Sequence, residues 1–199
     1  MLLPDRYIPF RRTTELLWAE RNRYGDSFRC IPFREIRFRF SPQKTMKIGY
    51  TTVVDQDVQY PSKHFAEEVA AYLADPDGWV SEGYVFTRSR SPDVVIHLSS
   101  PEYLAKNGCR DGTLSCAEIN GRNMYLNAMR WIEGASPSKL QLKDYRQYMV
   151  SHEMGHILGH NHVDCPREDA PALIMLQQTK GIGKCKPNTK LTERDRKKK

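Results

Sequence analysis

The sequence predicts a mixed α/β domain in which a sheet of about five strands is backed by two long helices. Three observations support this class: five short runs are β-branched or alternate apolar with polar residues, one segment has a helical apolar stripe, and a longer helical segment follows the last strand. Their order along the chain is strand, helix, four strands, long helix. That order is typical of helices that cover a single sheet.

Five strands are expected between residues 47 and 128. They are Lys47–Val54, Gly83–Thr87, Asp93–Leu98, Thr113–Ile119 and Arg122–Ala128. The last two are separated by Asn120-Gly121, a dipeptide that strongly favours a hairpin turn. We therefore expect these two strands to pair in antiparallel fashion.

Two helices are expected, one before and one after the last four strands in the sequence. The first covers Ser62–Ala74, and its apolar residues recur with helical spacing. They are Phe65, Val69, Tyr72 and Leu73. The second covers Lys139–Leu158 and ends before Gly159, because a left-handed residue after a helix costs little only for glycine. An irregular segment of about 40 residues follows.

Length and charge divide the chain into three parts. Its 199 residues suffice for one well-buried domain, which we place at residues 45–190. Residues 1–44 form a basic, aromatic-rich extension, interpreted as a pro-segment or as accessory strands, and residues 191–199 form a basic tail, of which residues 194–199 are expected to be solvated. Residues 45–179 carry twelve basic and seventeen acidic side chains. Because a body that grips nucleic acid would itself be basic, nucleic-acid binding through the tails is the less favoured interpretation.

Nothing in the composition predicts a membrane protein. No stretch approaches the roughly 18 apolar residues of a membrane span. The first residues are interrupted by charge before an apolar segment of signal-peptide length can form. We therefore expect neither a membrane span nor a signal peptide in this chain.

The segment from residue 152 to residue 162 contains four of the six histidines. His152 and His156 are four residues apart on the predicted helix, so both imidazoles can reach one ion at about 2.0–2.1 Å. A chain reversal at Gly159 lets His162 approach the same ion. Three imidazoles and a water form the ligand set of a catalytic zinc site, whereas structural sites use four protein ligands. The sequence therefore predicts one Zn²⁺ ion on these three residues, with His160 nearby rather than coordinating.

Glu153 follows the first predicted ligand directly. Its carboxylate can reach a water on the ion, take a proton from it, and deliver that proton to a leaving amine. Asp164, or equally a backbone carbonyl, is expected to orient a ligand imidazole. These residues predict a zinc-dependent endopeptidase with Glu153 as general base and a protein or peptide as substrate. The alternative is a zinc-stabilised binding or structural module with little or no turnover.

The five cysteines leave two interpretations open. Cys109 and Cys116 are seven residues apart, and Cys165 and Cys185 follow the histidines, so both spacings can close as disulfides. Two disulfides imply an oxidising compartment, whereas five free thiols imply a reducing one. Cys30 is expected to be an idle thiol, and the less favoured alternative is that its thiolate caps the zinc.

At residues 152–162 the chain resembles the metzincin zinc endopeptidases, whose signature His-Glu-x-x-His-x-x-Gly-x-x-His it matches. The resemblance implies a five-stranded sheet with two helices, the second carrying the motif, and a methionine turn beneath the metal. Met175 is the candidate for that turn. Some metzincins place a metal-contacting tyrosine two residues later, where this chain has Gln177, so that role is not carried over.

More narrowly, residues 46–190 resemble a poorly characterised metzincin-like family of secreted bacterial proteins. The matching stretches are residues 74–79, 127–131, 145–148 and 175–181, together with the spacing of Cys109 and Cys116. The resemblance implies the Cys165–Cys185 pairing and an extracellular or otherwise oxidising setting. It offers no counterpart for residues 1–44. For a substrate peptide we expect pairing with a sheet edge, with Thr113–Ile119 as the candidate strand.

Overall fold

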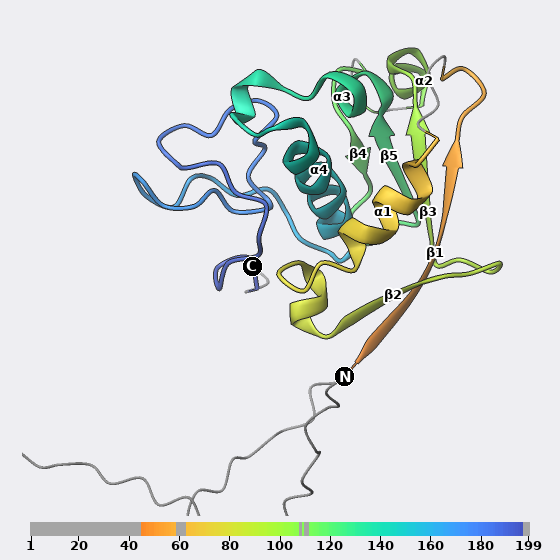
Figure 1. Cartoon of the computed structure of the whole chain (residues 1–199), viewed down its shortest axis with the longest axis horizontal. Coiled ribbons are helices and arrows are strands. Elements are labelled where there is room, and N and C mark those ends of the chain that lie inside the picture. The colour runs from red at the N-terminus through yellow and green to blue at the C-terminus, as the bar shows by residue number, and fades with distance from the viewer. Residues whose placement is uncertain (1–44, 59–62, 108, 110–111, 197–199) are drawn as a thin grey trace, which may run out of the picture. The chain divides into compact units, whose positions relative to one another are not determined.

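The computed structural model describes residues 45–58, 63–107, 109 and 112–196 (Figure 1). Its strands are β1 Met46–Val54, β2 Tyr84–Arg88, β3 Val94–Ser99, β4 Cys116–Ala117 and β5 Asn123–Asn127. Its helices are α1 Phe65–Leu73, α2 Pro101–Lys106, α3 Ala128–Glu133 and α4 Leu142–Ile157, with 3₁₀ turns η2 Trp79–Glu82 and η3 Ser136–Ser138. The predicted mixed α/β class is confirmed. The expectations for residues 1–44, including the role of Cys30, lie outside the described residues.

The five strands form one sheet in the order β2-β1-β3-β5-β4. All neighbours are parallel except β4 and β5, which pair antiparallel as the Asn120-Gly121 turn predicts. β1 pairs with two strands in succession, its first half with β2 and its second half with β3, and Tyr50 belongs to both registers. β4, the first strand of this hairpin, therefore lies at one edge of the sheet and pairs with β5.

Helices α1 and α4 lie beside each other on one face of the sheet (Figure 1). The alternating side chains of β3 and β5 point into the same core, where Ile96, Met124 and Leu126 are fully buried. The four apolar residues that predicted the α1 stripe are all buried against this core. None of the helices in the described part of the chain is both long and apolar enough to cross a bilayer.

Two predicted elements differ clearly from the structure, the second helix and the strand over residues 113–119, and the structure gives a reason for each. α4 begins at Leu142 rather than Lys139, because Lys139 is in the left-handed conformation (φ 58°) that ends η3. The predicted strand over residues 113–119 is reduced to β4, because Thr113 O accepts a bond from Arg130 Nε and Ser115 Oγ accepts one from Asn127 N.

Two short helices were not predicted. α2 begins with a proline after Ser100, whose hydroxyl accepts from Tyr103 N. α3 begins directly after β5, where the side chain of Asn127 accepts from Arg130 N. Each has six residues. Helices of this length carry less than two turns of apolar periodicity, so only their caps mark them in the sequence.

Candidate metal centre

The candidate metal centre is built on the last turns of α4. His152 and His156 leave the same face of this helix, as their four-residue spacing predicts. The helix then ends in a Schellman motif, in which His160 N donates to Gly155 O and Gly159 N donates to His156 O, both at 2.9 Å. Gly159 has φ 89°, as predicted. The motif reverses the chain and directs the following residues back toward the helix.

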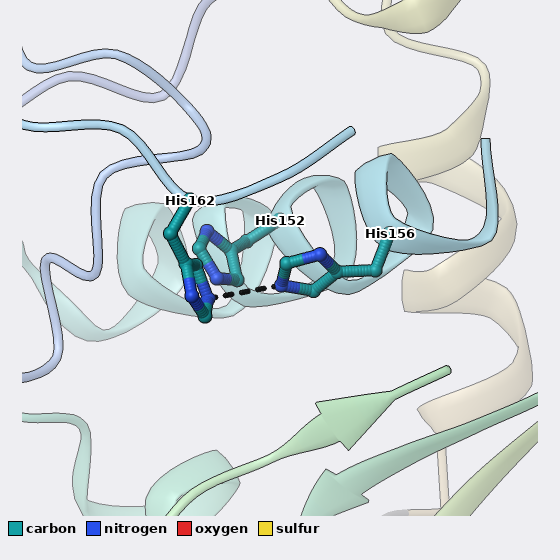
Figure 2. Close-up of side chains that lie close together, drawn as sticks. All are labelled: His152, His156 and His162. Atoms are coloured by element: carbon teal, nitrogen blue, oxygen red, sulfur yellow. Dashed lines mark hydrogen bonds between the residues drawn. The ribbon is translucent and has the colours of Figure 1, made fainter. Parts of the chain in front are cut away.

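This reversal brings His162 to the other two imidazoles (Figure 2). One ligand atom from each of the three residues lies within 4.8 Å of the others, so the group is able to bind a metal ion. His156 Nε2 and His162 Nε2 are 3.0 Å apart. Nitrogens at about 2.0–2.1 Å from a tetrahedral zinc ion are roughly 3.3 Å apart, so this separation suits the ion. The structure thus assembles the three predicted ligands.

Backbone carbonyls orient the two helical imidazoles. His152 Nδ1 donates to Ile174 O at 2.7 Å, and His156 Nδ1 donates to His160 O at 2.8 Å. Each bond fixes the ring and leaves Nε2 for a metal. Of the two orienting groups that the sequence allowed, the carbonyl rather than Asp164 serves these two rings. His160 itself is buried, and its ring packs against Trp79 with the centroids 4.6 Å apart.

Burial keeps the helical imidazoles neutral. It lowers the pKa of His152 to about 3 and also lowers the pKa of His156. Because an imidazole must be deprotonated to bind a metal, burial of these rings favours binding at neutral pH. His162 is exposed, which places it at the open side of the group.

Glu153 lies in the same cavity as the three histidines. The residue is 5% exposed, and its Oε2 has no hydrogen-bond partner among the described residues. Burial raises the pKa of the Glu153 carboxyl to about 8, because it disfavours the charged form. A buried carboxyl oxygen without a partner is costly and calls for an explanation. A proton-transfer role beside a bound ion would supply one.

The cavity that contains these groups has a volume of about 290 Å³. One wall comes from the hairpin segment around β4, including residues 114–117 and the Cys109–Cys116 disulfide. Another comes from Tyr148 and Met149 on α4. A third comes from Gln177, Thr179 and Lys180, which follow the candidate methionine turn. The site is therefore a cleft between a sheet edge and the C-terminal segment.

Met175 packs against α4, the helix that carries His152 and His156. A Cβ atom on Gly155 would lie 2.3 Å from Met175 Sδ and 2.9 Å from Trp79 Cζ2, so this helix position has no room for a side chain. Met175 is buried, and its carbonyl accepts from Val163 N, just after the third histidine. The candidate turn thus contacts both the helix and the segment that carries His162.

Two further contacts of the site were not predicted. Tyr148 OH donates to Leu176 O at 2.9 Å and accepts from Gln178 N at 2.8 Å, which joins α4 to the segment after Met175. Asp195 Oδ1 accepts from Ile174 N at 2.7 Å, and the carbonyl of Ile174 is the one that orients His152. Neither contact has a local sequence signal, since each joins residues more than 20 positions apart.

Asp195 also corrects the interpretation of the chain end. Residues 194–199 were expected to be solvated, yet Asp195 is buried, as is Leu191 shortly before it. Leu191 N donates to Asp77 O, and Arg196 pairs with Glu82 at 3.0 Å. The part of this segment that the structure describes therefore packs against the domain. In the sequence, the only sign of this packing was Leu191, an isolated apolar residue in a charged segment.

The contacts of His97 and of the four paired cysteines are those of residues that stabilise the fold. His97 lies on β3, within the strand predicted over Asp93–Leu98, with Nδ1 3.2 Å from Asp55 Oδ1 and its ring stacked on Tyr125. Both cysteine pairs are bonded: the Cα atoms of Cys109 and Cys116 are 5.7 Å apart, and those of Cys165 and Cys185 are 5.8 Å apart. The structure therefore agrees with the interpretation in which both cysteine pairs form disulfides.

Fold and site together define a mixed α/β domain with a three-histidine candidate metal centre in a cleft at the sheet edge. The chain belongs to the family described as "Protein of unknown function (DUF3152)", which it matches over residues 24–196. No curated protein matches the chain. Among solved structures, it is similar to archaemetzincin from Methanopyrus kandleri, with a TM-score of 0.46 and 14% sequence identity. The match covers 76% of this chain and 92% of that chain.

Proposed function

We propose that this protein is a zinc-dependent endopeptidase. The observation that carries the proposal is the convergence of three imidazoles on a cleft that also holds the carboxyl of Glu153, whose Oε2 has no hydrogen-bond partner among the described residues. The donor set suits zinc, and the ligands would be His152, His156 and His162. Bound there, Zn²⁺ supplies a water activated at neutral pH and polarises a substrate carbonyl.

The chain's own residues would handle the proton and the peptide. Glu153, kept as a carboxylate by the positive charge of the bound ion, would accept a proton from the attacking water through Oε2, which has no competing donor among the described residues, and pass it to the leaving nitrogen. Because His152 Nδ1 and His156 Nδ1 are bonded to backbone carbonyls, the two rings would keep their orientation during the reaction. The exposed backbone of β4 would pair with an extended substrate, because this strand has a neighbour on one side only.

The disulfides bear on where such an enzyme would act. Disulfides persist in oxidising compartments, and both bonded pairs lie in the domain that carries the metal centre. One of them forms part of the cleft wall. These features support an extracellular or otherwise oxidising setting.

The test is Glu153→Gln, assayed with a diverse peptide library in the presence and absence of a chelator. Glu67→Gln is the matched control, because Glu67 is exposed on α1 and is not among the residues that line the cleft. We expect Glu153→Gln to retain one zinc per chain and to lose about 10²–10⁴-fold in turnover, the usual contribution of a general base. The control should keep full activity.

Two other outcomes have clear meanings. Turnover retained by Glu153→Gln would remove this residue from the mechanism. A wild-type protein that binds zinc stoichiometrically but cleaves no peptide would favour the alternative, a zinc-stabilised binding or structural module.

A further inference from the structure

Lys180 stands on the wall of the cleft that holds His152 and Glu153. Its side chain is exposed, and Nζ donates to Gln177 Oε1 at 3.1 Å. Of the described residues that line the cavity, it is the one lysine or arginine. A cation therefore lies beside the groups to which we assign the chemistry.

The backbone that carries Lys180 is held firmly to α4. Tyr145 OH and Thr179 Oγ1 are 3.0 Å apart, and Tyr148 OH binds both Leu176 O and Gln178 N. Within the segment, Lys180 N donates to Gln177 O at 2.9 Å. Because both tyrosines belong to the metal-site helix, the root of the Lys180 side chain has a fixed place relative to the metal centre.

Among the described residues, Lys180 forms no ion pair. The other three lysines of residues 180–196 each face a carboxylate: Lys184 faces Glu168, Lys186 faces Asp169, and Lys190 faces Asp77. The described residues provide Lys180 with a neutral amide partner instead. The one carboxyl among the described residues that line the cavity, that of Glu153, is buried. An ammonium of this kind is suited to a negative charge brought by a ligand.

We propose that Lys180 recognises a carboxylate of the substrate, so that peptides with an aspartate or glutamate side chain next to the scissile bond are favoured. The inference rests on the proposed peptidase function and names its substrate class. The neutral Gln177 amide can release the ammonium without leaving a buried charge, because both groups lie at the surface of the cleft. A positive side chain at the same substrate position would be repelled.

The experiment compares peptides that differ only in glutamate, glutamine or lysine at each position beside the cleaved bond. The variants are Lys180→Glu, which reverses the charge, and Lys184→Glu, which makes the same change outside the cleft. We expect the wild type to favour glutamate over glutamine by roughly fivefold in kcat/KM, the size of an ion pair with an exposed lysine. The preference should weaken at high salt. Lys180→Glu should favour the lysine peptide, and Lys184→Glu should behave as wild type.

Measurements of peptide binding test the role of Lys180 independently of the proposed peptidase activity. Peptide affinity is also measured with zinc-loaded Glu153→Gln and with the double variant Glu153→Gln/Lys180→Glu. A glutamate preference in binding that disappears in the double variant supports the role of Lys180, even if the wild type cleaves nothing and the peptidase proposal fails. Equal treatment of glutamate and glutamine peptides, or a glutamate preference that survives Lys180→Glu, would overturn it.

Discussion

Replacing Gly155 by alanine tests whether the metal-site helix depends on close packing with the methionine turn. In an open helix this change would stabilise the protein by about 1 kcal/mol, because glycine is a poor helix former. Here the added Cβ would lie 2.3 Å from Met175 Sδ and 2.9 Å from Trp79 Cζ2. Both side chains are almost fully buried, and Trp79 Nε1 is held by Ser151 O at 2.8 Å.

The two effects oppose each other, and the clash is the larger. Overpacking of a core costs about 1–3 kcal/mol, and a contact far below van der Waals distance with two buried groups belongs at the upper end. After the gain in helix propensity, we expect Gly155→Ala to lower the free energy of unfolding by about 2 kcal/mol. Denaturant unfolding of the zinc-free protein measures this change. Lys143→Ala, on the exposed side of α4, should change the stability by less than about 0.5 kcal/mol.

A double-mutant cycle identifies the clash as the cause. Met175→Ala alone should cost about 2–5 kcal/mol, because it removes a buried side chain. In Met175→Ala the contact with Met175 Sδ is gone and only the one with Trp79 Cζ2 remains, so the double variant should be more stable than the sum of the single changes by about 1 kcal/mol. Additive effects, or a Gly155→Ala variant as stable as wild type, would refute the packing argument.

Three further changes probe the ligands and their support. His162→Ala should weaken zinc binding and abolish most of the thermal stabilisation that saturating zinc produces, measured by melting with and without the metal. Asp195→Ala should lower zinc affinity by about 10–100-fold in a chelator competition, because it releases the Ile174 backbone that orients His152. Replacing Cys165 and Cys185 by serine should cost about 3 kcal/mol of unfolding free energy, from a separation of 20 residues.

Each of these expectations has an outcome that contradicts it. Unchanged zinc content in His162→Ala would make His160 the third ligand. For Asp195→Ala, a loss of stability without a loss of zinc affinity would reduce the residue to a structural role; Lys190→Ala, which removes another contact of the same segment, is the control. A variant with serine at both positions that is as stable as the wild type would show that the Cys165–Cys185 bond adds nothing to stability.

The elements that were predicted well are those with a full local pattern. α1 has two turns of apolar periodicity, and the core residues of β3 alternate along the strand, so each element signals its buried face within a few residues. The short β4, by contrast, is defined by bonds from Arg130 and Asn127 to its flanking segment. Such bonds join residues twelve or more positions apart, and no local period reports them.

The same division holds within the metal centre. The spacing of His152, His156 and Gly159 by itself determined that two imidazoles share a helix face and that the chain reverses after them, because helix geometry and the glycine conformation are local properties. Only the tertiary structure decided which groups hold the rings and complete the cleft. Ile174, Asp195 and Lys180 reach the site from a segment without regular structure, whose path is set by contacts with α4 that form when the whole domain folds.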